Sequence, residues 1–597
     1  MQKKSLTHIE HNVDFCVVGG GLAGVCAAIA AAREGSKVVL MHERPMPGGN
    51  ASSEIRMWVC GANGSNNRET GIIEEILLES LYRNPEKNYY IWDSILFEKV
   101  RQEPNIELLL NCSCCDAEMD GNKIVSVTGW QMTTQKWHTV YAKYFADCSG
   151  DSILAPLTGA NYRMGREAAS EYNEQIAQIV ADSKTMGMSC LIQARLTDRK
   201  SKFVAPDWAV KMTPEMISMR KPQLDKPSEN FWYLELGGEK DTIADTEEIR
   251  DELLALAYGM WDYIKNSGEI ENADFWQLDF VGILPGKRES RRMIGKYVMT
   301  SNDVMSGGHF DDNVAYGGWP LDDHHPKGFY YKGKPNTWNN TPSPYGIPYR
   351  CLYSENIENL FFAGRNISMT HAAMSSTRVM ATCAILGEAI GIAADIAREF
   401  DLSPHEVYQK KIKLLQQRLL YKDCFIPYLK REIPDIVKQS ALVAEPDIQN
   451  INNLRNGADR NNCTYNDNEE QGCFCAPGTS IRYDLPNPTP VKEVRITFDS
   501  DLDRTTLPGN EIERQKVTRA ITFPDSPDTH PPLTLVSEFI VLVTLPDGSE
   551  VNIIHEVNNR KRTVFIPVNM TISSLKLIPL KTWGDYDSIH IFSFDFI

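Results

Sequence analysis

The sequence predicts an α/β fold: a Rossmann-like dinucleotide-binding domain, an inserted α+β region and a C-terminal all-β sandwich. Within the first 35 residues an apolar strand, a glycine-rich turn and an Ala-rich helix follow one another, which is the order of a βαβ dinucleotide-binding unit. From about residue 450, short β-rich runs alternate with turn residues, a pattern typical of a sandwich. A chain of 597 residues also needs more than one hydrophobic core.

The first glycine-rich turn has the spacing that a dinucleotide requires. Residues 14–18 predict a buried strand, and Gly19, Gly21 and Gly24 follow as Gly-x-Gly-x-x-Gly. We expect the first glycine to allow the tight turn and the second to let the backbone approach a pyrophosphate. The third would let helix and strand pack closely, and the helix N-terminus would offer free N–H groups to the phosphates.

The next stretch indicates which dinucleotide is bound. A second strand ends before Glu43, about twenty residues after the turn, where a carboxylate accepts hydrogen bonds from a ribose diol. A second glycine turn then runs through Gly48 and Gly49 to Ser52. An acid followed by Gly-Gly-x-x-Ser resembles flavoproteins of the glutathione-reductase and succinate-dehydrogenase type. The resemblance implies that the cofactor is FAD rather than NAD.

Two later strands end in similar turns. One leads to Gly150 and Asp151, and the other leads to Gly364 and Arg365. In flavoproteins of the type that this chain resembles, such turns approach FAD.

A helix rich in Ala and Gly is predicted over residues 377–399, with Ser375 and Ser376 as N-cap candidates. The resemblance implies that the positive end of its dipole points at the pyrimidine side of the flavin, where it stabilises the reduced cofactor. The complete set of predicted cofactor contacts is Gly19, Gly21, Leu22, Ala23, Gly24, Glu43, Arg44, Gly48, Gly49, Asn50, Ser52, Cys114, Gly150, Asp151, Gly364, Arg365, Ser375 and Thr377.

Taken in order, these motifs resemble the bacterial FAD-dependent oxidoreductase family, which is broadly related to fumarate-reductase and thiazole-biosynthesis flavoproteins. The resemblance also uses residues 284–292 and 371–380, and it covers about residues 12–400. It implies an oxidoreductase that exchanges electrons with a small-molecule substrate and with an electron acceptor that the sequence does not identify.

Four side chains near these motifs are candidates for catalysis. His371 follows the last glycine turn, and its imidazole titrates near neutral pH, so it is the first acid/base candidate; a structural hydrogen bond is the alternative. Arg288 and Arg291 belong to a basic run that could bind a carboxylate, as in the fumarate-reductase relatives, or pair with the protein's own carboxylates. Arg56 follows the second glycine turn and could face the flavin or an anionic substrate.

Residues 301–350 lack regular periodicity but are rich in aromatic residues, which indicates a lid rather than disorder. His309, His324 and His325 are lid candidates, and His309 joins the catalytic set. The adjacent histidines make poor chelating geometry, so no metal site is predicted.

The predicted domains are discontinuous. The FAD-binding domain takes residues 1–164 and returns at 351–400, the substrate or cap region takes 165–350, a helical linker takes 401–449, and a sandwich takes 450–597. The sandwich resembles galactose-binding-like modules, which favours a carbohydrate or a carbohydrate-derived acid as the substrate. Two alternatives stay open: reduction of an unsaturated carboxylate, and a glycan-binding protein whose flavin fold is vestigial.

The bulk composition excludes some functions. With 42% hydrophobic and 24% charged residues, the composition is that of a soluble globular protein. The net charge of −17 argues against binding to nucleic acid, which needs clustered cations. The sequence contains no run of about 18 apolar residues, so no membrane span is predicted. Residues 1–12 show no signal peptide, so a cytoplasmic protein is expected, or a secreted or periplasmic one if the N-terminus was trimmed.

Overall fold

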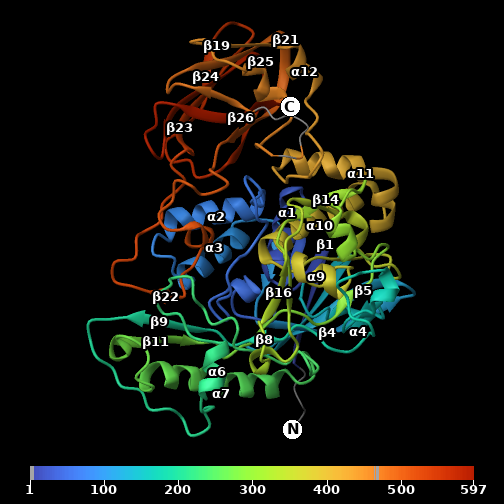
Figure 1. Cartoon of the computed structure of the whole chain (residues 1–597). Helices are drawn as coiled ribbons and strands as arrows, with labels where there is room; N and C mark the ends of the chain where they lie inside the picture. Colours follow the sequence, from blue (N-terminus) through green and yellow to red (C-terminus); the bar gives the residue numbers. More distant parts are fainter. Residues whose placement is uncertain (1–5, 463, 465–469) are drawn as a thin grey trace. The chain divides into compact units, whose positions relative to one another are not determined.

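The computed structural model describes residues 6–462, 464 and 470–597. The chain forms two compact units, whose elements are labelled in Figure 1. The first unit comprises Met1–Asn63, Glu86–Leu415 and Lys516–Pro527, and the second comprises Gly64–Pro85, Gln416–Gln515 and Asp528–Ile597. Residues 64–85, which the prediction gave to the FAD-binding domain, lie in the second unit. Residues 516–527, which the prediction gave to the sandwich, lie in the first unit.

A seven-stranded sheet forms the centre of the first unit, in the order β3-β2-β1-β6-β5-β4, with β18 also paired to β6. Its strands are β1 (Thr7–Val18), β2 (Val38–Met41), β3 (Ile106–Leu109), β4 (Cys112–Asp120), β5 (Lys123–Gln131), β6 (Lys136–Asp147) and β18 (Leu360–Phe362). The pairs among β1, β2, β3, β6 and β18 are parallel, whereas β4 and β5 form an antiparallel excursion. This arrangement confirms the predicted Rossmann-type sheet.

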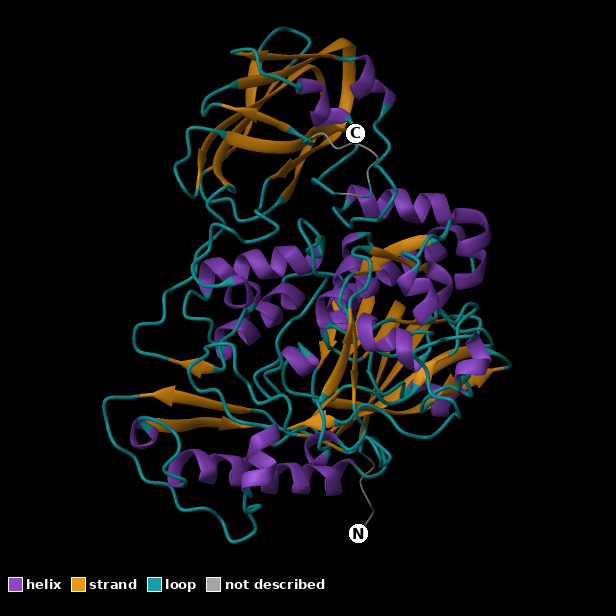
Figure 2. Cartoon of the chain, viewed as in Figure 1, coloured by secondary structure: helices purple, strands orange, loops and turns teal. Residues whose placement is uncertain are grey.

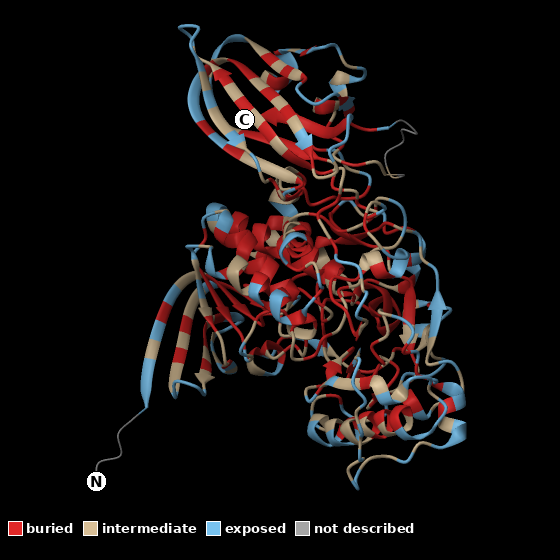
Figure 3. Ribbon diagram, turned by 90° about the vertical axis from the view of Figure 1, so that its left-hand side faces the viewer, coloured by how far each residue is buried: buried red, intermediate tan, exposed pale blue. Residues whose placement is uncertain are grey.

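Helices α1 (Leu22–Arg33) and α10 (Met380–Phe400) pack so closely that their backbones are in contact. A Cβ added to Gly387 would lie 2.0 Å from the carbonyl oxygen of Ala23, so only glycine fits there. Figure 3 shows how completely the centre of this unit is buried, while the first part of β1, next to the N-terminus, is exposed.

Within the described residues, α10 is the one helix that is long and apolar enough to cross a membrane by length and composition. Of its most apolar 18-residue window, 94% is buried inside the protein, as expected for a core helix.

The helix predicted over residues 377–399 is α10, which begins only at Met380, and a shorter helix, α9 (His371–Thr377), precedes it. The prediction of Ser375 and Ser376 as N-caps was therefore wrong, because both lie inside α9. Thr370 caps α9 instead, and its hydroxyl accepts a hydrogen bond from the backbone N–H of Ala373. The break falls at Val379, whose extended backbone cannot continue a helix.

The inserted region is built on helix α7 (Thr246–Asn266) and on small sheets. One of these sheets has the order β11-β9-β22, from β11 (Trp276–Val281), β9 (Ile192–Leu196) and β22 (Ile521–Thr522). The strand β10 (Glu235–Leu236) is short, and Phe231 before it has a left-handed backbone, with φ 59°. The shorter elements of this unit are α3 (Tyr89–Arg101), α4 (Leu154–Thr158), α5 (Ala169–Tyr172), α6 (Pro214–Met219), α8 (Ser301–Met305), β7 (Tyr162–Arg163), β8 (Met188–Ser189), β12 (Gly286–Lys287) and β13 (Arg292–Met293).

The aperiodic stretch 301–350 contains two short antiparallel pairs. Strands β14 (Asn313–Gly317) and β17 (Tyr345–Pro348) form one pair, and β15 (Leu321–His324) and β16 (Asn336–Asn339) form the other. These strands have only four or five residues each, too few for a periodic pattern to stand out in the sequence.

The second unit contains a seven-stranded antiparallel sheet in the order β20-β26-β21-β25-β23-β24, with β19 paired to β21 (Figure 2). Its elements are β19 (Ala441–Glu445), β20 (Cys473–Cys475), β21 (Ser480–Phe498), β23 (Val536–Thr544), β24 (Glu550–Glu556), β25 (Thr563–Thr582), β26 (Ile589–Phe596), α2 (Ile72–Arg83), α12 (Asp435–Gln439) and α13 (Glu511–Gln515), and α11 (Pro404–Tyr421) spans the sequence boundary between the units. The predicted short β-rich runs are in part longer strands, because β25 is continuous over 20 residues. Register shifts between β21 and β25 bend the sheet around a core that includes Leu78 and Leu81 of α2.

Candidate cofactor and substrate site

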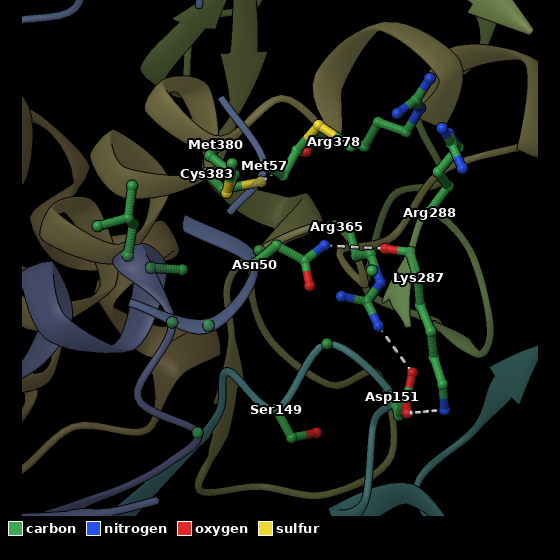
Figure 4. A pocket seen from close by; sticks show the side chains of 18 of the residues that line it. Asn50, Met57, Ser149, Asp151, Lys287, Arg288, Arg365, Arg378, Met380 and Cys383 are labelled. Carbon is green, nitrogen blue, oxygen red and sulfur yellow. Dashed lines mark hydrogen bonds and ion pairs between the residues drawn. The ribbon is translucent and has the colours of Figure 1, made fainter. Parts of the chain in front are cut away.

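The predicted glycine turns meet at one cavity of about 600 Å³ in the first unit (Figure 4). The turns at Gly19–Gly21, Gly48–Gly49, Gly150–Asp151 and Gly364–Arg365 all line it. The turns follow the carboxyl ends of β1, β2, β6 and β18 in the parallel sheet. Parallel sheets bind ligands at this edge. Segments that are distant in the sequence thus form one site.

The three glycines of the first turn differ in their surroundings. Gly19 has φ +107°, and a Cβ there would lie 2.3 Å from the carbonyl carbon of Cys148. A Cβ on Gly24 would lie 1.8 Å from the carbonyl oxygen of Gly19, so Gly24 packs behind the turn and does not line the cavity. A Cβ on Gly21 would meet no atom within 4 Å. The Gly21 backbone therefore borders open space in which a phosphate can approach.

His42, which the sequence analysis did not single out, lines the cavity beside this turn. Its Nδ1 accepts a hydrogen bond from the Gly20 backbone N–H at 2.9 Å. Burial, with a smaller contribution from Arg44, lowers the pKa of His42 to about 3. The ring is therefore neutral at pH 7 and carries its proton on Nε2, a buried atom without a hydrogen-bond partner among the described residues.

A cationic cluster surrounds the third turn. Asp151 lies 2.7 Å from both Arg365 Nη2 and Lys287 Nζ (Figure 4). It also accepts a hydrogen bond from Ser290. Burial would raise the pKa of Asp151, but Arg365 and Lys287 outweigh it and lower the pKa to about 2. Asp151 is thus ionised and fixes the two cations at the cavity wall.

The lining fits FAD. His42 Nε2, Arg44 Nη1 and Arg365 Nε are buried donor atoms without hydrogen-bond partners among the described residues. Donors and cations beside glycine backbone at a cavity wall are what a diphosphate requires. Glu43, whose side chain is 57% exposed, lines the same cavity at the position expected for a ribose contact.

Most of the predicted cofactor contacts lie on this wall. Those that line the cavity are Gly19, Gly21, Leu22, Ala23, Glu43, Arg44, Gly48, Gly49, Asn50, Cys114, Gly150, Asp151, Gly364 and Arg365. Four do not. Gly24 packs behind the first turn. Ser52 donates a hydrogen bond to the Gly49 carbonyl and so holds the second turn, and the Thr377 hydroxyl contacts the Met369 sulfur. Ser375 lines a different cavity.

The other end of the cavity carries a buried charge cluster. His324 Nδ1 lies 2.6 Å from Glu235, and its Nε2 lies 3.4 Å from Asp322. Arg288 lies 3.4 Å from Glu235, and Arg378 lies 3.3 Å from Asp322. In Figure 4 the guanidinium groups of Arg288 and Arg378 lie at the same end of the cavity.

Both carboxylates of this cluster are ionised. Burial would raise the pKa of Glu235, but Arg288 and His324 outweigh it and lower the pKa. The pKa of Asp322 is also lowered, because a hydrogen bond from His324 and the charges of His324 and Arg378 outweigh burial.

Four tryptophans line the same cavity: Trp58, Trp232, Trp319 and Trp338. Charged groups beside aromatic walls can orient a polar substrate and keep water away.

Of the catalytic candidates, only Arg288 lines this cavity. His371 lines a second cavity of about 900 Å³, with Nδ1 2.8 Å from Glu289 and Nε2 3.1 Å from Asp323. Burial would lower the pKa of His371, but Glu289 and Asp323 raise it to about 10, so the ring is charged at pH 7. His371 thus lies outside the cavity that the glycine turns line, with its charged ring held between two carboxylates.

The other three catalytic candidates lie away from both cavities. Arg56 is buried, bonds to Gln193 and stacks on Phe280 at 4.0 Å. Arg291 lies over the Tyr162 ring, and His309 lies exposed in the loop after α8. The structure therefore does not bring them to the flavin cavity.

Sequence reasoning missed several lining residues. His324 was named only as a lid histidine, and Arg378, Trp232 and Lys516 were not named. Alternation along Leu321–His324 could have placed Asp322 and His324 on one face of a strand. No motif marks Lys516, which comes from a segment far from the others in the sequence. In the part of the chain that the structure describes, no group of three or more His, Cys, Asp or Glu residues could hold a metal ion.

The sheet, the glycine turns and the donor-lined cavity define a flavoprotein of the dinucleotide-binding type. The family model described as FAD dependent oxidoreductase matches residues 14–419. The chain belongs to this family, and its cofactor is FAD.

Among solved structures, similar chains include a geranylgeranyl bacteriochlorophyll reductase-like protein from Thermoplasma acidophilum, at 13% identity over 69% of this chain and 84% of that one, with a TM-score of 0.30. Sdh1 from Mycobacterium smegmatis matches at 13% identity over 65% and 69% of the two chains, with a TM-score of 0.27. A family 32 carbohydrate-binding module from Streptococcus pneumoniae EndoD matches at 12% identity over 27% of this chain and 97% of that one, with a TM-score of 0.20. No match is found among curated proteins.

Proposed function

We propose that the protein transfers hydride between FAD and a small polar organic substrate derived from a carbohydrate. One observation carries the proposal: Arg288, Arg378 and His324 line the same cavity as the glycine turns. FAD, when bound, supplies the two-electron chemistry. The side chains at the other end of the cavity then bind the substrate and move its proton.

In this proposal His324 is the acid/base group. A hydroxyl that is oxidised to a carbonyl loses a proton as well as a hydride, and imidazole is suited to accept the proton near pH 7. Its Nδ1 is held by Glu235, and its Nε2, 3.4 Å from Asp322, is the nitrogen that exchanges the proton with the substrate. Arg288 and Arg378 bind polar groups of the substrate, and the tryptophans cover its apolar face.

The test starts with the visible spectrum of the full-length protein, before and after dithionite. Sugars and sugar acids are then screened under anaerobic conditions for bleaching of the bound flavin. Bleaching by one of them, with a stoichiometric carbonyl product, is the expected result. A protein that takes up FAD but is bleached by none of them contradicts the proposed substrate class, and a protein that takes up no FAD contradicts the proposal as a whole.

A second candidate is the reduction of an unsaturated carboxylate. Two guanidinium groups at one end of the cavity favour it, because arginine binds carboxylates in a bidentate manner. The test is anaerobic reoxidation of the dithionite-reduced protein by fumarate or another 2-enoate. Reoxidation at a rate that saturates with the 2-enoate supports this candidate over sugar oxidation.

A further inference from the structure

One part of the cavity wall comes from a late segment of the chain. Lys516–Pro527 belongs to the first unit, although the residues on both sides of it belong to the second. Ile521 pairs with Ala194 in the β22–β9 ladder and is fully buried. The Arg519 N–H donates to the Lys87 carbonyl, and the Arg519 carbonyl accepts from Gln193 Nε2 at 3.1 Å. The backbone just after Lys516 is thus held in place by the first unit.

Lys516 lines the flavin cavity and is only 9% exposed. Its Nζ lies 3.4 Å from Cys60 Sγ and 4.3 Å from the centre of the Trp58 ring. Met57, Trp58 and Cys60 follow the second glycine turn, and all three line the cavity. Lys516 therefore contacts the part of the cavity wall that follows the second glycine turn in the sequence.

The other cations on the wall each have a carboxylate within 4 Å. Lys287 and Arg365 pair with Asp151, Arg288 pairs with Glu235, Arg378 pairs with Asp322, and Arg44 pairs with Glu43. Lys516 has no such carboxylate among the residues that the structure describes. A thiol and an aromatic face replace only part of the hydration that a buried ammonium loses. The wall therefore keeps one positive charge that the protein itself does not balance.

We propose that Lys516 binds a carboxylate of the substrate inside the flavin cavity. This inference rests on the proposed function and narrows it, because the substrate then is an acid, such as a sugar acid, rather than a neutral sugar. Lys516 lies beyond residues 14–419, the part of the chain that the family model matches. The segment 516–527 thus adds an anion-binding group to the family's cofactor fold.

The experiment uses the full-length protein with and without FAD and titrates it with acetate, at constant ionic strength. Acetamide is the neutral probe of equal size, and inorganic phosphate is the competing anion. Binding is read from tryptophan fluorescence, since Nζ lies over Trp58, and from the flavin difference spectrum. The variants are Lys516→Gln, Lys516→Arg and, as a matched control on an exposed lysine of the same unit, Lys221→Gln.

We expect saturable binding of acetate and none of acetamide. Lys516→Gln should weaken acetate binding at least about tenfold, which corresponds to about 1.4 kcal/mol. Lys516→Arg should bind acetate within about threefold of the unchanged protein, since it keeps the positive charge, and Lys221→Gln should bind it equally well.

Three results would overturn the inference. These are acetate binding equally well to Lys516→Gln, acetate not binding at all, and phosphate binding more tightly than acetate with the same dependence on Lys516. The fluorescence titration also works without FAD, so a protein that fails to take up FAD refutes the proposed function separately from the inference on Lys516.

Discussion

Asp322 and Asp323 are consecutive residues of β15, yet they serve two different cavities. Asp322 lies beside His324 and Arg378 in the flavin cavity, whereas Asp323 contacts His371 in the second cavity. Successive side chains of a strand point to opposite faces, so the β15–β16 hairpin separates the two spaces. Trp338 on β16 lines both cavities. A register shift of one residue would exchange the two aspartates.

Replacing His324 should stop turnover while FAD stays bound. His324→Gln removes the group that takes up the proton, and we expect kcat to fall at least about 100-fold. The measurement is the rate of anaerobic flavin bleaching by the substrate found in the screen. His325→Gln is the control, because His325 stacks on Tyr331 at the second cavity and should keep near-normal turnover. Equal rates in both variants would remove His324 from the mechanism.

His371 should make stability depend on pH in the alkaline range. Its folded-state pKa of about 10 lies above the value of about 6.5 that it has when unfolded. The charged ring therefore stabilises the folded state fully below pH 6.5, and this contribution is lost as the pH rises to 10, by at most about 1.4 kcal/mol per pH unit. Urea unfolding of the unchanged protein and of His371→Gln between pH 6 and pH 10 checks this. The difference in unfolding free energy between the two should shrink as the pH rises, and a constant difference would contradict the expectation.

Two glycines of the first turn should respond differently to substitution. Gly21→Val places a side chain in open space, so we expect FAD affinity to fall at least about tenfold with stability changed by no more than about 1 kcal/mol. Gly19→Ala puts a Cβ against the Cys148 backbone at φ +107°, and it should destabilise the protein by more than about 2 kcal/mol. FAD titration and urea unfolding of both variants separate the effects. A Gly21→Val protein that binds FAD normally would show that the cofactor does not approach this turn.

A buried ion pair in the second unit should matter for stability alone. Arg504 Nη2 lies 2.6 Å from Glu74, and both side chains are at most 2% exposed. Arg504→Met removes the cation that pairs with a buried carboxylate and should cost about 3–5 kcal/mol. The double variant Arg504→Met, Glu74→Leu should recover most of this loss, because both members of the buried pair are removed together. Urea unfolding measures both, and a double variant as unstable as the single one would contradict the account.

Local patterns in the sequence were enough for the cofactor half of the site. A glycine turn after a strand depends on neighbouring residues, so its spacing predicts both its shape and its partner phosphate. The turns at Gly19–Gly24, Gly48–Gly49, Gly150 and Gly364 could thus be assigned to FAD one by one. One boundary was wrong because backbone geometry decides it: the helix predicted from residue 377 begins only at Met380, after the extended Val379.

By itself, the sequence determined the fold class, the family and the cofactor, because these depend on short motifs and on hydrophobic periodicity. Only the tertiary structure decided which charged side chains share the flavin cavity. It placed His324 and Arg378 there, sent His371 to the other side of the hairpin, and added Lys516 from a segment beyond the family region. The physical reason is that a substrate site is assembled from single side chains on separate elements. Their meeting depends on strand register and on packing between distant segments, and neither leaves a local pattern in the sequence.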